Sequence, residues 1–513
     1  MGKQDALQNC QIRPIVNALL RYVSRFPPDV AHVDRIIPLT LAVALFMENM
    51  DATVIATSLP AIAADIGTTP VALKLAFTAY FVALAIFIPV SAWMADKFGA
   101  KNVFRAAIAV FILGSIACAF AGSLHEFVLA RFVKGMGGAM MSPLARLILL
   151  RTTDRTRLVD AMAWLTIPAL IAPTMGPPVG GFLTTYLSWH WIFLINVPIG
   201  LIGLVLITIF LPRIDPGPQR PMDFIGFTLL GFAFSGIVFG LSLVSMPVLP
   251  MWLAAVSTGV GIFAGIVYIA YSRHAAHPLL DLNILREPTF RGTVTGTTIF
   301  LIGVGAIPFL LPLMLQLGFG FSPFESGMVT FVGAFGALIM KFFAGRLYMT
   351  IGFRSALMWA AVLTSITMVI KGSFQPGTPV VLMMAVILIA GIFRSTYFTG
   401  QNALTFSEID DDDTGPATAI HAVVRPIATA LGVALAGGIL EGSAQLRGGE
   451  IELADFQIAF YIIAAVSLLA AVPFLLMSRT AGSAISGYRS RAERAQALAD
   501  AEGAGHEANA PRL

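Results

Sequence analysis

Long apolar runs separated by short polar connectors repeat along the whole chain. Crossing the hydrocarbon core of a bilayer takes about 20 apolar residues in a helix. Runs of that length lie near residues 37–62, 73–94, 103–122, 127–149, 160–184 and 191–212, then near 223–245 and 250–271, and finally near 291–316, 324–348, 355–372, 379–402, 416–440 and 456–478. The pattern predicts an all-α polytopic membrane protein with about fourteen transmembrane helices.

Polar and turn-forming connectors group these helices into units. The connector 212–221 is rich in proline, and a second polar connector covers 272–288. Such stretches end helices and separate domains. We expect an amino-terminal arm over 1–36, a six-helix bundle over 37–212, a linker with two extra helices over 213–290, a second six-helix bundle over 291–478, and a tail over 479–513 that lacks an apolar stripe and is disordered.

Basic residues gather on one side of the predicted membrane. The opposite side carries only Lys74, Lys371 and Arg447. Because cytoplasmic loops of membrane proteins are enriched in Lys and Arg, both termini are predicted to be cytoplasmic. The formal net charge of +4 follows this topology, so no nucleic-acid partner is implied.

The composition argues against several other classes of protein. Of the 513 residues, 57% are hydrophobic and 12% are charged, whereas an ordinary soluble domain has about 25% charged residues. Cys10 and Cys118 lie in the polar arm and in an apolar helix, and predict neither a disulfide framework nor a metal site. Every loop is short and no phosphate-binding glycine loop occurs. We therefore expect no cofactor, no use of ATP and no enzyme.

Once the charges near the two membrane surfaces are set aside, six charged residues remain deep inside predicted helices, where a charge is costly and usually functional. They are Glu48, Asp51, Arg131, Lys134, Arg394 and Arg425. Glu48 and Asp51 are three positions apart, which is about 60° around a helix, so they share one face. That face is expected to look into protein or water, not lipid.

The connector after the second helix has a pattern of charges and glycine. It reads DKFGAK, in which Gly99 permits a tight reversal while Asp96, Lys97 and Lys101 can hold helix ends or one another. It resembles the loop signature G-x-L-x-D-R/K-x-G-R/K-R/K of the major facilitator superfamily, and residues 345–354, GRLYMTIGFR, are a weaker copy that supports two six-helix halves. The resemblance implies that this loop takes part in gating and does not contact the substrate. A loop that only fixes topology is the alternative.

Further motifs point to one branch of that superfamily. Residues 131–139, RFVKGMGGA, resemble the fourth-helix motif R-x-x-Q-G-x-G-x-A, with Lys134 in place of the Gln. Residues 176–181, GPPVGG, resemble the antiporter motif through Gly176, Pro177, Gly180 and Gly181. MENMDATVIATSLP at 47–60 resembles the first-helix motif L-D-x-T-x-x-N-x-A-L-P of the fourteen-helix drug:proton antiporters, and WHWIFLINVPIG at 189–200 and GIFRSTYFTGQN at 391–402 are similar to other sequences of that branch.

This resemblance implies the major facilitator fold, with two six-helix bundles and two extra central helices. It also implies a proton-coupled secondary antiporter of the bacterial inner membrane, which exports hydrophobic drugs or toxic compounds, cationic ones among them, by alternating access. Its partners would be a small-molecule substrate, protons and the lipid bilayer; a periplasmic adaptor and an outer-membrane channel, as found with similar permeases, are left open. Asp51 is expected to carry the proton and Arg131 to pair with it. Glu48 either shares the proton or meets a cationic substrate.

Candidates for the substrate cavity lie mainly in the second half. Arg394, Tyr397 and Gln401 occupy one helix face, and Lys134 and Arg425 add cations. For the residues of the second half, hydrogen bonding between helices is the alternative role, and for Lys134 the alternative is a structural pair with Glu48. Two other functions also stay open. Transport of one specific metabolite would fit a cavity lined by fixed charge pairs, and a non-transporting receptor or enzyme would need a soluble domain.

Overall fold

The computed structural model describes residues 30–154, 156–212, 214, 221–244, 250–410, 413–478 and 480–488. The amino-terminal part of the predicted arm, 1–29, and most of the predicted tail, 489–513, lie outside the described residues. Within the described ranges the chain is almost entirely helical and has no strand. This is the result expected for a chain that must satisfy its backbone hydrogen bonds inside a bilayer.

The amino-terminal bundle contains six spans, several of which are interrupted. The first span continues beyond its long helix as a 3₁₀ turn and then a short helix that has Pro60 in its first turn. The second span bends by 54° between its two helices. The elements are α2 (Val30–Val54) with η1 (Ile55–Thr57) and α3 (Leu59–Asp65), α4 (Lys74–Phe87) with α5 (Ser91–Phe98), α6 (Ala100–Ala119), α7 (Leu124–Thr152), α8 (Leu158–Tyr186), and α9 (Trp191–Leu194) with α10 (Asn196–Phe210).

Two helices and then a second bundle follow. The two helices are α11 (Phe224–Leu243) and α12 (Met251–Ser272). The second bundle contains η2 (Leu282–Arg286), α13 (Pro288–Val304) with α14 (Ile307–Leu313) and η3 (Met314–Gly318), α15 (Pro323–Gly372), α16 (Val380–Thr405), α17 (Thr414–Arg447), α18 (Leu453–Leu469) with α19 (Ala471–Leu476), and α20 (Ser483–Ser486).

The number of spans agrees with the predicted number. Eleven helices of the described chain are long and apolar enough to cross a bilayer, or twelve when α4 and α5 count as one bent span. Helix α7 has 29 residues and is also long enough, although Arg131, Lys134 and Arg146 lower its hydropathy. Helix α15 has 50 residues but turns back at Gly352, where φ is 74°. Counting α7, and α15 as two spans, gives fourteen.

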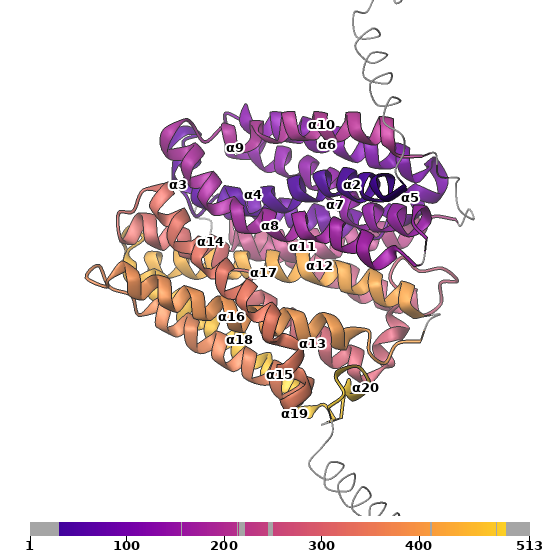
Figure 1. Cartoon of the computed structure of the whole chain (residues 1–513). Coiled ribbons are helices and arrows are strands. Elements are labelled where there is room, and N and C mark those ends of the chain that lie inside the picture. Colours follow the sequence, from indigo (N-terminus) through magenta and orange to yellow (C-terminus); the bar gives the residue numbers. More distant parts are fainter. Residues whose placement is uncertain are drawn as a thin grey trace, which may run out of the picture.

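The two bundles lie side by side, with α2 to α10 in one and α13 to α19 in the other (Figure 1). They meet where α8 packs on α15 and where α4 packs on α17. Helix α11 pairs with α12 and contacts both α4 and α17, so this pair covers one side of the junction between the bundles.

Some bounds differ from those predicted. Helix α2 begins at Val30, seven residues before the predicted span. Residues 480–488, in the predicted tail, contain the short helix α20, and they pack on the second bundle: a Cβ on Gly482 would meet the ring of Phe353. Tyr488 lies against Gly352 at the turn within α15.

Candidate functional site

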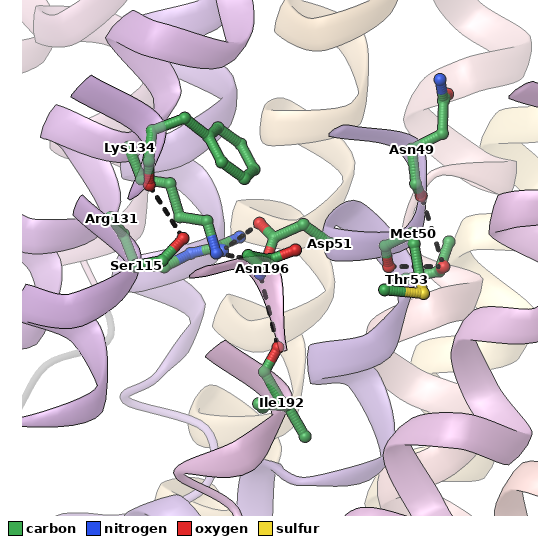
Figure 2. Close-up of polar contacts among 10 residues, drawn as sticks. Asn49, Met50, Asp51, Thr53, Ser115, Arg131, Lys134, Ile192 and Asn196 are labelled. Atoms are coloured by element: carbon green, nitrogen blue, oxygen red, sulfur yellow. Dashed lines mark hydrogen bonds and ion pairs between the residues drawn. The ribbon is translucent and has the colours of Figure 1, made fainter. Parts of the chain in front are cut away.

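Asp51 lies in the interior of the amino-terminal bundle and is bonded from three sides. Arg131 on α7 donates a hydrogen bond of 2.9 Å to Oδ2, and Lys134, one turn further along α7, donates to Oδ1. Asn196 at the start of α10 donates to Oδ1 at 3.3 Å. Figure 2 shows these side chains converging from α7 and α10 on α2. Asp51 and Lys134 are 0% exposed and Arg131 is 1% exposed, so water does not reach the group in this conformation.

This group, Asp51 with Arg131 and Lys134, contains two cations and one anion. The excess positive charge is placed among aromatic faces, which attract cations. The guanidinium of Arg131 lies 4.4 Å from the ring centre of Tyr80, and Lys134 Nζ lies 4.7 and 4.8 Å from the ring centres of Phe111 and Phe193. Each oxygen of the Asp51 carboxylate thus accepts a hydrogen bond from one of the two cationic side chains.

Glycines of the antiporter-like motif bring α8 against the turn of α2 that follows Asp51. A Cβ on Gly176 would overlap the side chain of Thr53, and a Cβ on Gly180 would overlap the backbone oxygen of Val54. Gly181, on another face of α8, leaves room for the backbone of Pro323 at the start of α15 in the other bundle. The helix that packs next to Asp51 therefore also forms part of the contact between the bundles. Pro177 lies inside α8 and contributes to the same contact, since its backbone oxygen lies against Gly327 of α15.

Glu48 has a different environment from Asp51. It is half-buried, and its Oε2 has no hydrogen-bond partner in the described structure. The charges that act on it are those of Arg146 on α7 and Arg425 on α17, one from each bundle. Both arginines are exposed to solvent. Glu48 therefore faces the second bundle, whereas Asp51 faces the interior of its own.

The residues of the predicted stripe on α16 separate in the structure. Tyr397 is 0% exposed and stacks on Phe300 at a centroid distance of 3.6 Å. Gln401 is 2% exposed and donates to Thr405 at 3.0 Å. Of the three, only Arg394 is partly exposed. Tyr397 and Gln401, like Lys134, are closed off from solvent in this conformation.

The residues of the predicted gating loop make their contacts inside the amino-terminal bundle. Asp96 on α5 accepts a hydrogen bond of 2.9 Å from Arg151 near the end of α7. Lys97 lies over the ring of Trp93, and Lys101 donates to the last carbonyl groups of α10, which have no partner within that helix. Gly99, with φ of 82°, makes the sharp turn between α5 and α6.

At the end of the molecule that contains α3 and α14 the two bundles are in direct contact. Lys74 on α4 forms an ion pair with Glu441 on α17, and Lys74 is 0% exposed. Gln316 of η3 donates to the backbone oxygen of Thr57 at 3.0 Å, and the backbone N–H of Phe324 donates to Thr185 at 3.1 Å. We call this end, defined by these three contacts, the closed end.

Several contributors to the site were not singled out from the sequence. Asn196 lies within the WHWIFLINVPIG stretch, but its bond to Asp51 depends on how α10 packs on α2. Arg146 was counted from the sequence among the basic residues of the cytoplasmic side, and it lies inside α7. Its spacing of fifteen residues from Arg131, about 60° around the helix, was the available signal.

Comparisons with known proteins agree with this architecture. A family model described as "Major Facilitator Superfamily" matches residues 41–271 and 293–501. The fold resembles the crystal structure of a D-xylose-proton symporter, with a TM-score of 0.63, 14% identity, and coverage of 87% of this chain and 98% of that one. It also resembles the POT family transporter PepTSo, with a TM-score of 0.64, 14% identity, and coverage of 86% and 97%. The chain belongs to the major facilitator superfamily of membrane transporters, which confirms the predicted family and fold.

Relatives in sequence come from enteric bacteria. The chain is 32% identical over 440 residues to a protein of Salmonella typhimurium named "Putative multidrug resistance protein MdtD", covering 86% of this chain and 93% of the relative. A Klebsiella pneumoniae protein of the same name is 32% identical over 441 residues, with the same coverage. The chain is thus a multi-pass transporter of the inner membrane and not an enzyme.

Proposed function

We propose that this transporter exports hydrophobic small molecules in exchange for protons, and that Asp51 carries the proton. The observation that carries the proposal is the group of Asp51, Arg131 and Lys134, sealed inside the first bundle. An acid at membrane depth with its cations on another helix is typical of proton relays in transporters. The name of the MdtD relatives, multidrug resistance protein, supports drugs as the class of compound that is exported.

Protonation of Asp51 would change how α2 and α7 hold together. A neutral Asp51 no longer balances Arg131 and Lys134, so the contact between α2 and α7 weakens. Helix α2 is tightly packed on α8 through Gly176 and Gly180, and α8 contacts α15 of the second bundle through Gly181. A shift of α2 therefore reaches the contact between the bundles through one helix. Such rocking of two bundles around a central site is the expected form of alternating access.

The direction of opening follows from the proposed topology. With both termini cytoplasmic, as the distribution of Lys and Arg predicts, the closed end with Lys74 and Glu441 is periplasmic. The exposed side chains of Arg146 and Arg425 then face the cytoplasmic side of the membrane. We therefore assign this conformation to an inward-facing state of the transport cycle.

A transporter for one specific metabolite is the second candidate. The exposed arginines of both bundles favour it, because fixed charges select substrates more narrowly than aromatic walls do. A periplasmic adaptor and an outer-membrane channel that complete the export path are a separate proposal. A pull-down with the intact protein tests it.

The proposal is tested by dye transport in everted membrane vesicles that contain the protein. Uptake of ethidium and of an anionic dye is measured with and without an imposed pH gradient, using Asp51→Asn vesicles as the comparison. We expect dye uptake by the native protein to require the pH gradient. We expect the Asp51→Asn vesicles to lose this gradient-driven uptake. Uptake that is equal with and without the gradient would contradict proton exchange.

A further inference from the structure

Three arginines lie between the two bundles without a salt-bridge partner among the described residues. Arg146 and Arg425 are exposed and Arg394 is half-buried. In the part of the chain that the structure describes, none of the three guanidinium groups takes part in a salt bridge or donates a hydrogen bond to protein. Among the described residues, Glu48 is the acid whose charge interacts with two of them, Arg146 and Arg425.

The position of two of these arginines in the membrane rules out a role in topology. Arg425 is eleven residues from the start of α17 at Thr414, and Arg394 is eleven residues from the end of α16 at Thr405. At about 1.5 Å per residue, each lies roughly 16 Å from the nearest helix end, close to the middle of a bilayer. The positive-inside rule acts on loops and helix ends, so it does not explain charges at this depth.

Arg425 is the member of this set whose charge interacts with both of the other arginines. Arg425 acts on Arg394 and Arg146 acts on Arg425, and like charges repel. With Glu48 ionised, three positive charges face one negative charge. An anion placed between the bundles would reduce this repulsion, while a cation would add to it.

An apolar surface lies next to the charges. The guanidinium of Arg425 lies 5.6 Å from the ring centre of Phe398, which is half-buried and packs edge-on against Phe300. Arginine pairs with planar anionic groups such as carboxylates and sulfonates through two parallel hydrogen bonds. The surroundings thus offer an anion-binding group beside an aromatic wall.

We propose that the substrate of this transporter is an organic anion with an apolar body, held between Arg394, Arg425 and Arg146 from the two bundles. The proposal rests on the proposed export function and names the class of its substrate. Glu48 acts as the competing internal anion. It lowers the affinity for the substrate and is not the acid that receives a cationic drug.

Binding to the purified protein in neutral detergent, measured by calorimetry, tests the proposal without transport. The probes are naphthalenesulfonate and naphthyltrimethylammonium, which share a ring system and differ in charge. We expect the sulfonate to bind at least about tenfold more tightly than the ammonium compound. Failure of the sulfonate to bind, or equal binding of the two probes, would overturn the proposal.

Variants test the assigned residues. Arg425→Gln and Arg394→Gln are each expected to weaken sulfonate binding by about tenfold, because each removes one charge-assisted contact. Arg425→Lys keeps the charge but loses the planar pair of donors. Its affinity for the sulfonate is expected to lie between those of the native protein and Arg425→Gln. Arg105→Gln on the outer helix α6, an exposed arginine, is the matched control and should bind as the native protein does.

Glu48→Gln gives a change that misfolding cannot imitate. At alkaline pH, where the Glu48 carboxyl is ionised, its removal is expected to strengthen sulfonate binding by roughly threefold or more. Unchanged or weaker binding in Glu48→Gln, or native binding in Arg425→Gln, would contradict the proposal. If gradient-driven export of ethidium occurs while the sulfonate does not bind, this inference fails and the proposed function stands; if the sulfonate binds but no uptake depends on the gradient, the reverse holds.

Discussion

Arg131 donates a 2.9 Å hydrogen bond to Asp51 across the contact between α7 and α2, and both side chains are shielded from water. Lys134 uses the other oxygen of the same carboxylate. Loss of the negative charge therefore leaves two buried cations without a counter-ion. On the proposed function, a proton taken up by Asp51 would therefore change how these helices pack.

The first prediction concerns the balance of this group. Asp51→Asn is expected to destabilise the folded protein by about 3–5 kcal/mol, the usual cost of leaving a buried charge unpaired. Thermal unfolding in detergent measures this. The double variant Asp51→Asn with Lys134→Gln removes one of the orphaned cations and should regain part of the lost stability. If it is less stable than Asp51→Asn alone, the two cations do not share Asp51 as their counter-ion.

The second prediction concerns the contact of α8 with α2. A Cβ on Gly180 would overlap the backbone oxygen of Val54, which cannot rotate away. Gly180→Ala is expected to cost about 1–3 kcal/mol or more through overpacking and to lower the yield of folded transporter. The control is Gly259→Ala on α12, where nothing lies within 4 Å of the new Cβ. Equal yields and melting temperatures for the two variants would show that α8 is not packed on α2 in this way.

The third prediction concerns the ion pair of Lys74 and Glu441. Both lie at the closed end, with exposed fractions of 0% and 11%. Lys74→Glu places two acids together and is expected to open that end, and the exchange of both residues, Lys74→Glu with Glu441→Lys, is expected to close it again. Labelling of a cysteine introduced at Thr57, which is 0% exposed at the closed end, with a membrane-impermeant maleimide reports the opening. Labelling that stays low in Lys74→Glu would mean that the pair does not hold the bundles together.

The fourth prediction separates gating from stability at the loop between α5 and α6. Asp96 and Arg151 are 27% and 30% exposed, so their ion pair contributes roughly 1 kcal/mol or less to folding. Asp96→Asn is therefore expected to leave the melting temperature nearly unchanged while slowing transport at least about tenfold, since one lost contact of 1.4 kcal/mol in the transition state has that effect. A variant that transports at the native rate would leave Asp96 with a role in topology only.

The sequence was sufficient for the fold and for the meeting of Asp51 with Arg131. The fold was predicted from apolar runs of bilayer length and from motifs that occur in the same order as in the superfamily. The contact was predicted because the fourth-helix motif supplies a cation, Arg131, for the acid on the first helix. That Lys134 shares the carboxylate was not predicted, because helical spacing places Arg131 and Lys134 on one face but does not say which acid they reach. The contact depends on how α2 and α7 pack.

Burial was the property that the sequence described least well. The stripe of Arg394, Tyr397 and Gln401 follows from helical periodicity, yet Tyr397 stacks on Phe300 inside the second bundle and only Arg394 reaches solvent. Periodicity gives a face, but the rotation of α16 against α13 decides which residues of that face are covered. Arg146 shows the opposite case, since its place near a helix end concealed its exposure between the bundles.

The central claim, that Asp51 couples protons to substrate, is tested most directly with the purified protein in proteoliposomes. Exchange of labelled for unlabelled substrate without a pH gradient reports binding and rocking of the bundles, and accumulation under a pH gradient reports coupling. We predict that Asp51→Asn keeps substrate exchange but no longer accumulates substrate against its concentration when a pH gradient is imposed. Accumulation by Asp51→Asn equal to that of the native protein would contradict the account.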